Sequence, residues 1–275
     1  MLHYFRVSTR IFFVLAIVSI LFSAFFACEA KSSKKKNNKK HFNIVTKNKV
    51  TPEYNEAARF FAGKTIDNKS KLFSYSKKSA YRYHRRRVLK GWNTFQGPNL
   101  KKIQKWWQQY KPEYYEKTIF YPFSGPDIMN ALTFFPDGEK FIMFGLEPPG
   151  KITLPHTMSH GKIRRNLAGL RRSIAFILRI NFFRTNDMKI DMTRRAFNSI
   201  TGVLMYFLAV NDYDIMSVRR IAINKDSNIV PYRKSDDRIR WQRPSPDRRI
   251  PGVEIIFEKN NKRKMIQYFN LNVIN

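Results

Sequence analysis

The hydrophobic positions of this chain repeat with two spacings, one helical and one strand-like. Apolar residues recur every three or four positions between residues 161 and 180, which predicts an amphipathic helix. The spacing also predicts helices over 52–63, through Ile103 and Tyr110, from Asp127 to about Phe135, and over 190–210. The last of these is expected to bury one face, formed by Phe197, Ile200, Leu204, Phe207 and Leu208.

Short apolar runs separate these helices and predict strands at 118–121, 140–146, 215–223, 252–258 and 265–270. We therefore expect an α/β or α+β fold, a mixed sheet with helices packed on it. Residues 51–117 are expected to form a basic-aromatic helical region and residues 118–275 the core domain. Residues 225–251 contain many charged residues and four prolines, which is typical of a long exposed loop.

Capping, proline and glycine residues predict where several helices begin and end. Thr51 is predicted to cap the first helix, Pro52 to occupy its first position and Gly63 to stop it. Gly97, Pro98 and Asn99 predict a break before the second helix.

Residues 1–30 have the pattern of an export signal. Arg6 and Arg10 precede an uncharged run from Ile11 to Ala27, and small residues follow at Cys28 and Ala30. Cys28 is the single cysteine, so disulfides within the chain are excluded and lipidation of Cys28 is one interpretation. Cleavage after Ala30 and an uncleaved anchor are the other two.

A lysine-rich segment, residues 31–50, follows directly and is predicted to be a solvated tether. Positive charge normally stays on the cytoplasmic side, which opposes export, whereas the well-formed signal pattern favours it. We expect an exported protein of the cell envelope, either anchored to a membrane or periplasmic.

Charge is the strongest compositional signal. The chain has 52 Lys and Arg against 20 Asp and Glu, a formal net charge of +32. An excess of this size favours polyanions as partners, although lysine-rich composition also arises without any selection for binding.

The basic and aromatic residues concentrate between Asn68 and Pro112, a stretch without any acid. Its candidate anion-binding residues are Arg85, Arg86, Arg87, Trp106 and Trp107. This composition suits a membrane surface or an anionic envelope polymer. It also suits nucleic acid if the chain is not exported, or simply aromatics packed inward beneath solvated cations.

Candidate catalytic residues lie where two predicted strands end. Ser124 and Asp127 follow the first strand and Glu147 follows the second. Two carboxyl groups at neighbouring strand ends suit acid–base hydrolysis or the binding of a cation. The alternative is structural, with Ser124 capping a helix, Pro126 starting it and Asp127 complementing its dipole.

Other chemical motifs are weak or missing. His156 and His160 have i, i+4 spacing, but Thr157 replaces the glutamate of a zinc-protease helix, and Pro155 and Gly161 favour a loop. No phosphate-binding glycine loop and no pair of cysteines is present, so no cofactor and no metal are expected.

Three short motifs stand out: Tyr121 to Asp127 (YPFSGPD), Phe134-Phe135-Pro136, and Gly145 to Pro148 (GLEP). Through them the chain resembles a family of uncharacterised bacterial exported proteins, and the resemblance covers about residues 120–270. It continues through Phe182 to Met188, Gly252-Val253 and Tyr268-Phe269. It implies export but no activity and no catalytic residues. Family members extend beyond the last strand, so we expect a truncated or degenerate member here.

Overall fold

The computed structural model describes residues 51–122, 127–152, 154–180, 200–234 and 249–271. Residues 44–275 form one compact unit, distinct from residues 1–43. The hydrophobic core of the described residues begins at Ala57 and runs through both predicted regions, 51–117 and 118–275. These two regions therefore share one core.

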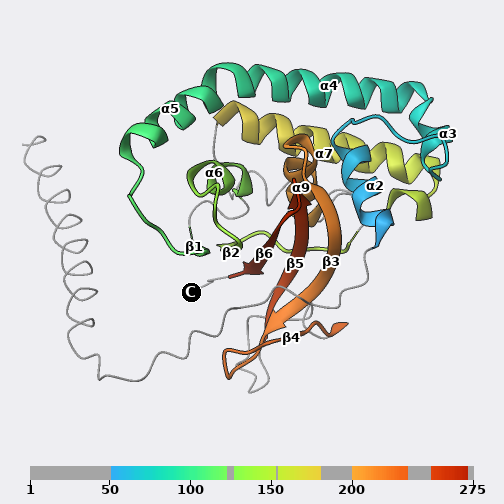
Figure 1. The fold of residues 1–275 in the computed structure, drawn as a ribbon. Helices are drawn as coiled ribbons and strands as arrows, with labels where there is room; N and C mark the ends of the chain where they lie inside the picture. The colour runs from blue at the N-terminus through green and yellow to red at the C-terminus, as the bar shows by residue number, and fades with distance from the viewer. Residues whose placement is uncertain (1–50, 123–126, 153, 181–199, 235–248, 272–275) are drawn as a thin grey trace, which may run out of the picture. The chain divides into compact units, whose positions relative to one another are not determined.

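A six-stranded mixed sheet forms the base of this unit, as the strand pattern predicts (Figure 1). Its order is β1-β2-β6-β5-β3-β4, in which β1, β2 and β6 are parallel and the remaining pairs are antiparallel. The strands are β1 (Thr118–Tyr121), β2 (Lys140–Gly145), β3 (Asp214–Ile223), β4 (Ile229–Pro231), β5 (Ile250–Lys259) and β6 (Lys262–Asn270). β4 lies within residues 225–251, the segment expected to be a long exposed loop. Residues 235–248 of this segment lie outside the described part.

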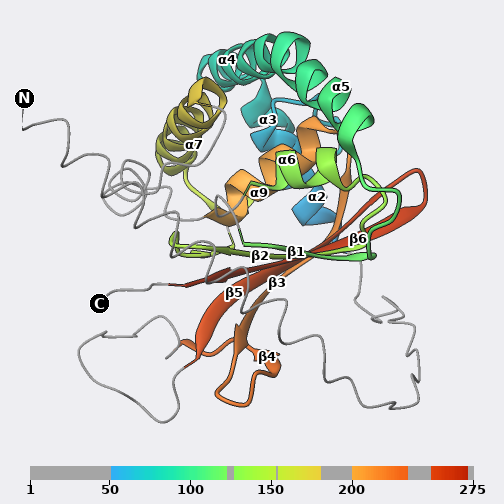
Figure 2. The ribbon, with the colours of Figure 1, turned by 90° about the vertical axis from the view of Figure 1, so that its left-hand side faces the viewer.

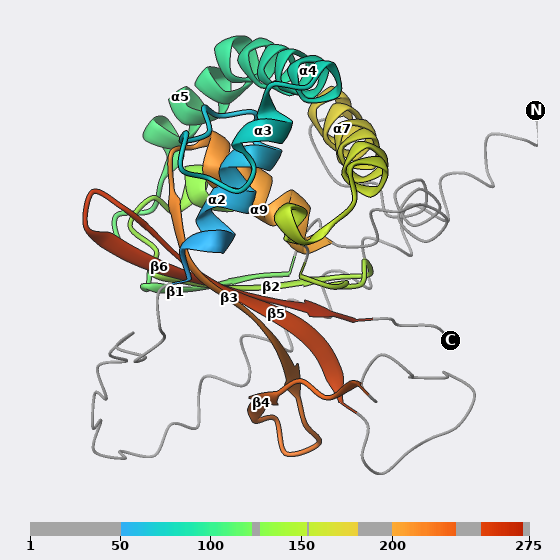
Figure 3. The ribbon, with the colours of Figure 1, turned by 90° about the vertical axis from the view of Figure 1, so that its right-hand side faces the viewer.

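The helices gather on one face of the sheet (Figures 2 and 3). They are α2 (Pro52–Phe61), α3 (Phe73–Ser76), α4 (Ser79–Phe95), α5 (Lys101–Tyr110), α6 (Ile128–Phe134), α7 (His160–Ile180) and α9 (Ile200–Val210), with a short 3₁₀ turn at Pro155–Thr157. α2, α6 and α9 lie next to the sheet, while α4 and α7 run side by side in an outer layer (Figures 1 and 2).

The helix α9 differs from its prediction. Every residue from Ile200 to Val210 is buried, so this helix has no solvent-facing side. The cause is its place between α2, α6, α7 and β3, which cover it on all sides. Phe197 and the rest of 190–199 lie outside the described residues.

The helix α4 owes its position to a buried stripe of Tyr81, His84, Val88, Trp92 and Phe95. The predicted break after it is wrong. Residues Gln96–Leu100 form a π-helical turn and the chain continues directly into α5. A widened turn of this kind accommodates Pro98, which has no N–H to donate to an ordinary helical turn.

The first helix ends as predicted. Gly63 follows α2 with a φ of 68°, and its N–H donates to the carbonyl of Phe60. Thr51 occupies the N-cap position without a capping side-chain hydrogen bond, and Pro52 begins the helix. The imidazole Nε2 of His84 donates to the backbone carbonyl of Phe61 at 2.8 Å, which ties the end of α2 to α4.

Candidate functional site

Asp127 lies between β1 and α6 and caps that helix. Its Oδ1 accepts a hydrogen bond from the backbone N–H of Asn130 at 3.3 Å. Its Oδ2 accepts from Asn130 Nδ2 at 2.8 Å and from the hydroxyl of Tyr121 at 3.4 Å. The cap is thus Asp127 and the first helical residue Ile128, which corrects the expectation of Ser124 and Pro126. Those two residues lie outside the described part of the chain.

Burial controls the charge of Asp127. The residue is 3% exposed, and loss of hydration raises the pKa of its carboxyl group to about 7, although the bonds from Asn130 and Tyr121 favour the charged form. Burial and the neighbouring carboxyl group likewise raise the pKa of Tyr121. A carboxyl group that titrates near neutral pH can give or take a proton under physiological conditions.

Glu147 lies just beyond β2 and is 1% exposed. The hydroxyl of Tyr268, on β6, lies 2.8 Å from the backbone oxygen of Glu147 and 3.2 Å from its Oε2, so one proton serves two acceptors. Burial and the adjacent glutamate raise the pKa of Tyr268.

The register of the sheet brings these two tyrosine–carboxyl pairs to one edge. Tyr121 is paired with Met143, and Met143 with Tyr268, along three parallel strands. Residues paired in this way point to the same face, and two strand spacings separate the tyrosines by roughly 10 Å. Asp127 and Glu147 therefore lie at the carboxyl ends of the parallel strands, on the side that the helices cover.

The predicted anion-binding residues fall into separate groups. Arg85, Arg86 and Arg87 are exposed along α4. Trp106 is 53% exposed, but Trp107 is only 9% exposed because its ring packs against Phe134 and Phe135, with ring centres 5.4 and 5.5 Å away. Trp107 is therefore a core residue, which corrects its placement on the binding surface.

Distance also separates these groups. Twenty residues of helical chain between Arg86 and Trp106 correspond to roughly 30 Å. The arginines and the tryptophans thus do not form one contact patch.

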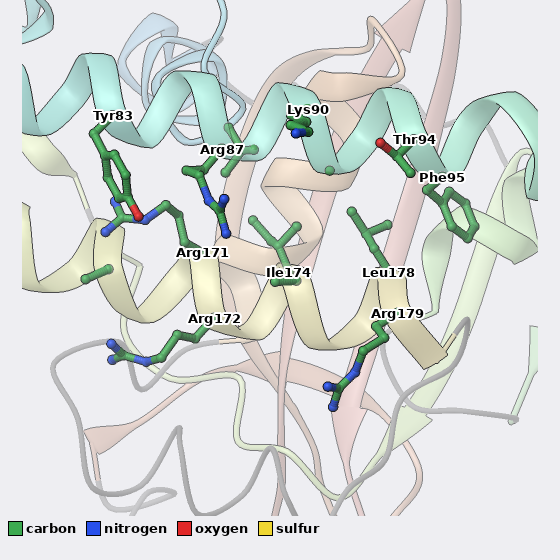
Figure 4. Close-up of a pocket in the computed structure, with 14 residues that line it drawn as sticks. Tyr83, Arg87, Lys90, Thr94, Phe95, Arg171, Arg172, Ile174, Leu178 and Arg179 are labelled. Atoms are coloured by element: carbon green, nitrogen blue, oxygen red, sulfur yellow. The ribbon is translucent and has the colours of Figure 1, made fainter.

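A groove of about 570 Å³ runs between α4 and α7 (Figure 4). Its apolar lining includes Val88, Gly91, Phe95, Ile174 and Leu178. Its cationic lining is contributed by both helices and consists of Arg87, Lys90, Arg171, Arg172 and Arg179. The arrangement combines a hydrophobic floor with a positively charged rim.

Among the described residues, no carboxylate lines this groove. Neither α4 nor α7 contains an acidic residue, and no Asp or Glu lines the groove. Within the described ranges, no ion pair involves any of its five cations. Their charge is available to an anion from outside.

Arg171 occupies the end of the groove near Tyr83. Its guanidinium carbon lies 4.9 Å from the centre of the Tyr83 ring, a cation–π contact. Partial burial lowers the pKa of Arg171, and the positive charges of Arg172 and Arg87 lower it further. An arginine stays charged in spite of such shifts, so the groove holds a partly desolvated cation.

The sequence analysis predicted the helix over residues 161–180 but gave no binding role to Arg171, Arg172 and Arg179. One feature of the sequence could have identified these arginines. Residues 160–180 form a helix with a continuous apolar stripe and contain no Asp or Glu. An ordinary surface helix mixes both signs of charge. Pairing of this helix with α4, which also lacks acids, is a tertiary fact that the sequence does not contain.

The two candidate metal-binding histidines belong to different helices. His156 lies in the 3₁₀ turn, and its Nε2 is 3.4 Å from Oε1 of Glu53. The ring of His160, in the first turn of α7, packs edge-on against Tyr75. The described residues contain no group of three or more His, Cys, Asp or Glu side chains that could hold a metal ion.

No helix in the described part of the chain has the length and hydropathy needed to cross a bilayer. The apolar run from Ile11 to Ala27 and Cys28 both lie outside that part. Comparison of the chain with protein-family models, with curated proteins and with solved structures found no match.

Proposed function

We propose that this protein binds an anionic component of the cell envelope, and that the groove between α4 and α7 is its contact surface. The observation that carries the proposal is a cationic rim without acids above an apolar floor. Charge complementarity of this kind fits the phosphate-bearing surface of a membrane. Export through residues 1–30 would bring the protein to such a surface.

The floor of the groove favours lipid over nucleic acid. Single-stranded nucleic acid binds by stacking its bases on exposed aromatic rings. Here the floor is mainly aliphatic, from Val88, Ile174 and Leu178, and the guanidinium of Arg171 already lies over the ring of Tyr83. An aliphatic floor suits acyl chains better than bases.

Vesicle flotation tests the proposal with residues 44–275, a compact unit with its own core. We expect binding to phosphatidylcholine vesicles to increase with added phosphatidylglycerol and to decrease with salt. Each basic residue near anionic lipid contributes about 1 kcal/mol, so Arg87→Gln/Arg171→Gln/Arg172→Gln should weaken binding roughly 100-fold.

The matched control removes the same charge from α5. The variant Lys101→Gln/Lys102→Gln/Lys105→Gln replaces three exposed cations outside the groove and should bind much more tightly than the groove variant. Equal losses in the two variants would mean that net charge, and not the groove, is responsible. Binding that ignores both anionic lipid and salt would overturn the proposal.

A second candidate is a hydrolase that uses Asp127 and Glu147, with Ser124 nearby in the sequence. The observation in its favour is the buried carboxyl group of Asp127, whose pKa of about 7 suits a general acid or base. Both acids also lie at the carboxyl ends of parallel strands, where α/β proteins commonly place their sites.

A further inference from the structure

We infer that the groove between α4 and α7 takes a single acyl chain of an anionic phospholipid, whose phosphate lies between Arg87 and Arg171. This inference rests on the proposed function and makes it more specific. It replaces general attraction to a charged membrane with the capture of one lipid molecule.

The two ends of the groove differ in chemistry. Tyr83, Arg87 and Arg171 gather at one end, whereas Ile174, Leu178 and Phe95 continue toward the other (Figure 4). The side chains of Arg172 and Arg179 extend from α7 away from α4, along the outer rim (Figure 4). Lys90, Thr94 and Arg179 line the second half of the groove at its rim, above and below this apolar floor. A charged head therefore fits between Arg87 and Arg171, and an apolar tail fits along the floor.

The cationic end suits a phosphate group. Arg171 is partly buried and is held over Tyr83, and Arg87 is close enough to affect its charge equilibrium. Arginine forks bind phosphate oxygens in pairs. Neither guanidinium group forms an ion pair with a described residue, and a phosphate between them would relieve their repulsion. Binding energy would thus come from charges that the fold leaves uncompensated.

Gly91 lets α4 and α7 approach each other closely in the middle of the groove. It faces α7 with no side chain, and a Cβ built there would lie 3.5 Å from Cδ1 of Leu178. A glycine in a helix interior costs about 1 kcal/mol relative to alanine, so this close approach has an energetic cost. A larger residue at this position would project into the path of a chain.

The dimensions suit one acyl chain. Tyr83 and Phe95 are twelve positions apart, which corresponds to roughly 18 Å of helix. An extended alkyl chain advances about 1.3 Å per carbon–carbon bond of about 1.5 Å, so about fourteen carbons fit this length. The volume of about 570 Å³ lies within the range of small-molecule sites.

Photo-cross-linking tests the inference. Residues 44–275 would be bound to vesicles containing phosphatidylglycerol with a diazirine in one acyl chain, then irradiated, and the adducts mapped by mass spectrometry. We expect adducts on the groove walls, within residues 88–95 and 171–179. An adventitious surface contact would instead scatter adducts over the exposed surface of the molecule.

Two variants fill the groove without changing its charge. Gly91→Leu fills it from α4, and Ala175→Leu fills it from α7, so either one serves if the other misfolds. Each buried methylene contributes about fourfold to affinity, and exclusion of two or more should reduce the groove adducts at least tenfold. Gly161→Leu, an equal substitution in the exposed first turn of α7, is the control and should leave them unchanged.

The outcomes separate this inference from the proposed function. If unsubstituted protein floats with anionic vesicles but its adducts lie outside the groove, or persist in both filled variants, the acyl-chain inference is wrong and the proposed function stands. If flotation does not depend on phosphatidylglycerol, both are wrong. Groove adducts that both filled variants lose establish the inference.

Discussion

At the scale of single residues, Asp127 places an ionisable carboxyl group in the hydrophobic core. Its pKa of about 7 lies well above the value of 3.8 expected for the unfolded chain. Between these two pH values the folded protein binds more protons than the unfolded chain. Stability must therefore decrease as the pH increases from about 4 to 7, because ionisation of the buried group is unfavourable.

Asp127→Asn removes this titration and is expected to flatten the pH dependence. Asparagine caps helices as well as aspartate, so α6 should persist. Relative to the unsubstituted protein, the variant should gain on the order of 4 kcal/mol of unfolding free energy between pH 4 and pH 8. Urea titrations across this range measure the difference.

The control for this comparison lies within the protein. His84 is buried, which lowers its pKa to about 4, so its contribution to stability decreases as the pH decreases below 6.5. That contribution is the same in both proteins and cancels in the difference. Parallel stability curves would contradict the shifted pKa of Asp127 and weaken the hydrolase candidate that depends on it.

Single residues show how far sequence reasoning reaches. The placement of Asp127 and Glu147 after successive strands was visible because strand ends can be located from apolar runs. Their tyrosine partners were not, since Tyr121 and Tyr268 are separated by 147 positions and meet only through the register of β1, β2 and β6. Trp107 was misplaced for a similar reason, because its burial depends on α6.

At the scale of elements, the junction of α2 with α4 is held by Gly63. Its positive φ suits glycine, and a Cβ there would lie 3.0 Å from both the Cα of Arg85 and Cγ2 of Val88. Neither the backbone conformation nor the space accepts a side chain. The same glycine thus ends one helix and admits the approach of another.

Gly63→Ala should lower the unfolding free energy by about 2–4 kcal/mol, since left-handed strain and overpacking add. Gly97→Ala is the matched control. No atom lies within 4 Å of a Cβ at Gly97, and alanine there should be neutral or stabilising. Chemical denaturation of both variants measures the contrast, and equal effects would contradict the close packing of α2 against α4.

Elements with regular periodicity were predicted well. The helix over 160–180 and the strands at 118–121 and 140–145 match their apolar patterns closely. The patterns could not reveal that α9 is enclosed on every side, because a wholly apolar helix does not indicate which of its faces is buried. They also could not reveal the π turn, because proline signals a break whether or not the chain continues.

At the scale of the whole molecule, the excess of positive charge is unevenly distributed. α4 and α7 lie side by side and carry eleven cations with no acid between them. Like charges this close oppose the packing of the two helices. The core beneath them, with Val88, Leu170, Ile174 and Ile177 all buried, must overcome that repulsion.

Stability should consequently rise with ionic strength. Raising salt from 0.01 M to 0.15 M shortens the screening length from about 30 Å to about 8 Å, which removes repulsion between all but neighbouring cations. If this recovers about 1 kcal/mol, the melting temperature increases by about 2–4 °C. Thermal melts at the two salt concentrations measure the effect.

A pair of double variants locates the repulsion. Arg87→Gln/Arg172→Gln removes two cations from the groove and should raise the melting temperature in low salt while reducing its salt dependence. Lys101→Gln/Lys102→Gln removes the same charge from exposed positions on α5 and should do less of both. Identical behaviour would show that total charge matters and not the pairing of α4 with α7. A groove that lowers stability in the absence of an anion, and is relieved by one, has the energetic character of a binding site.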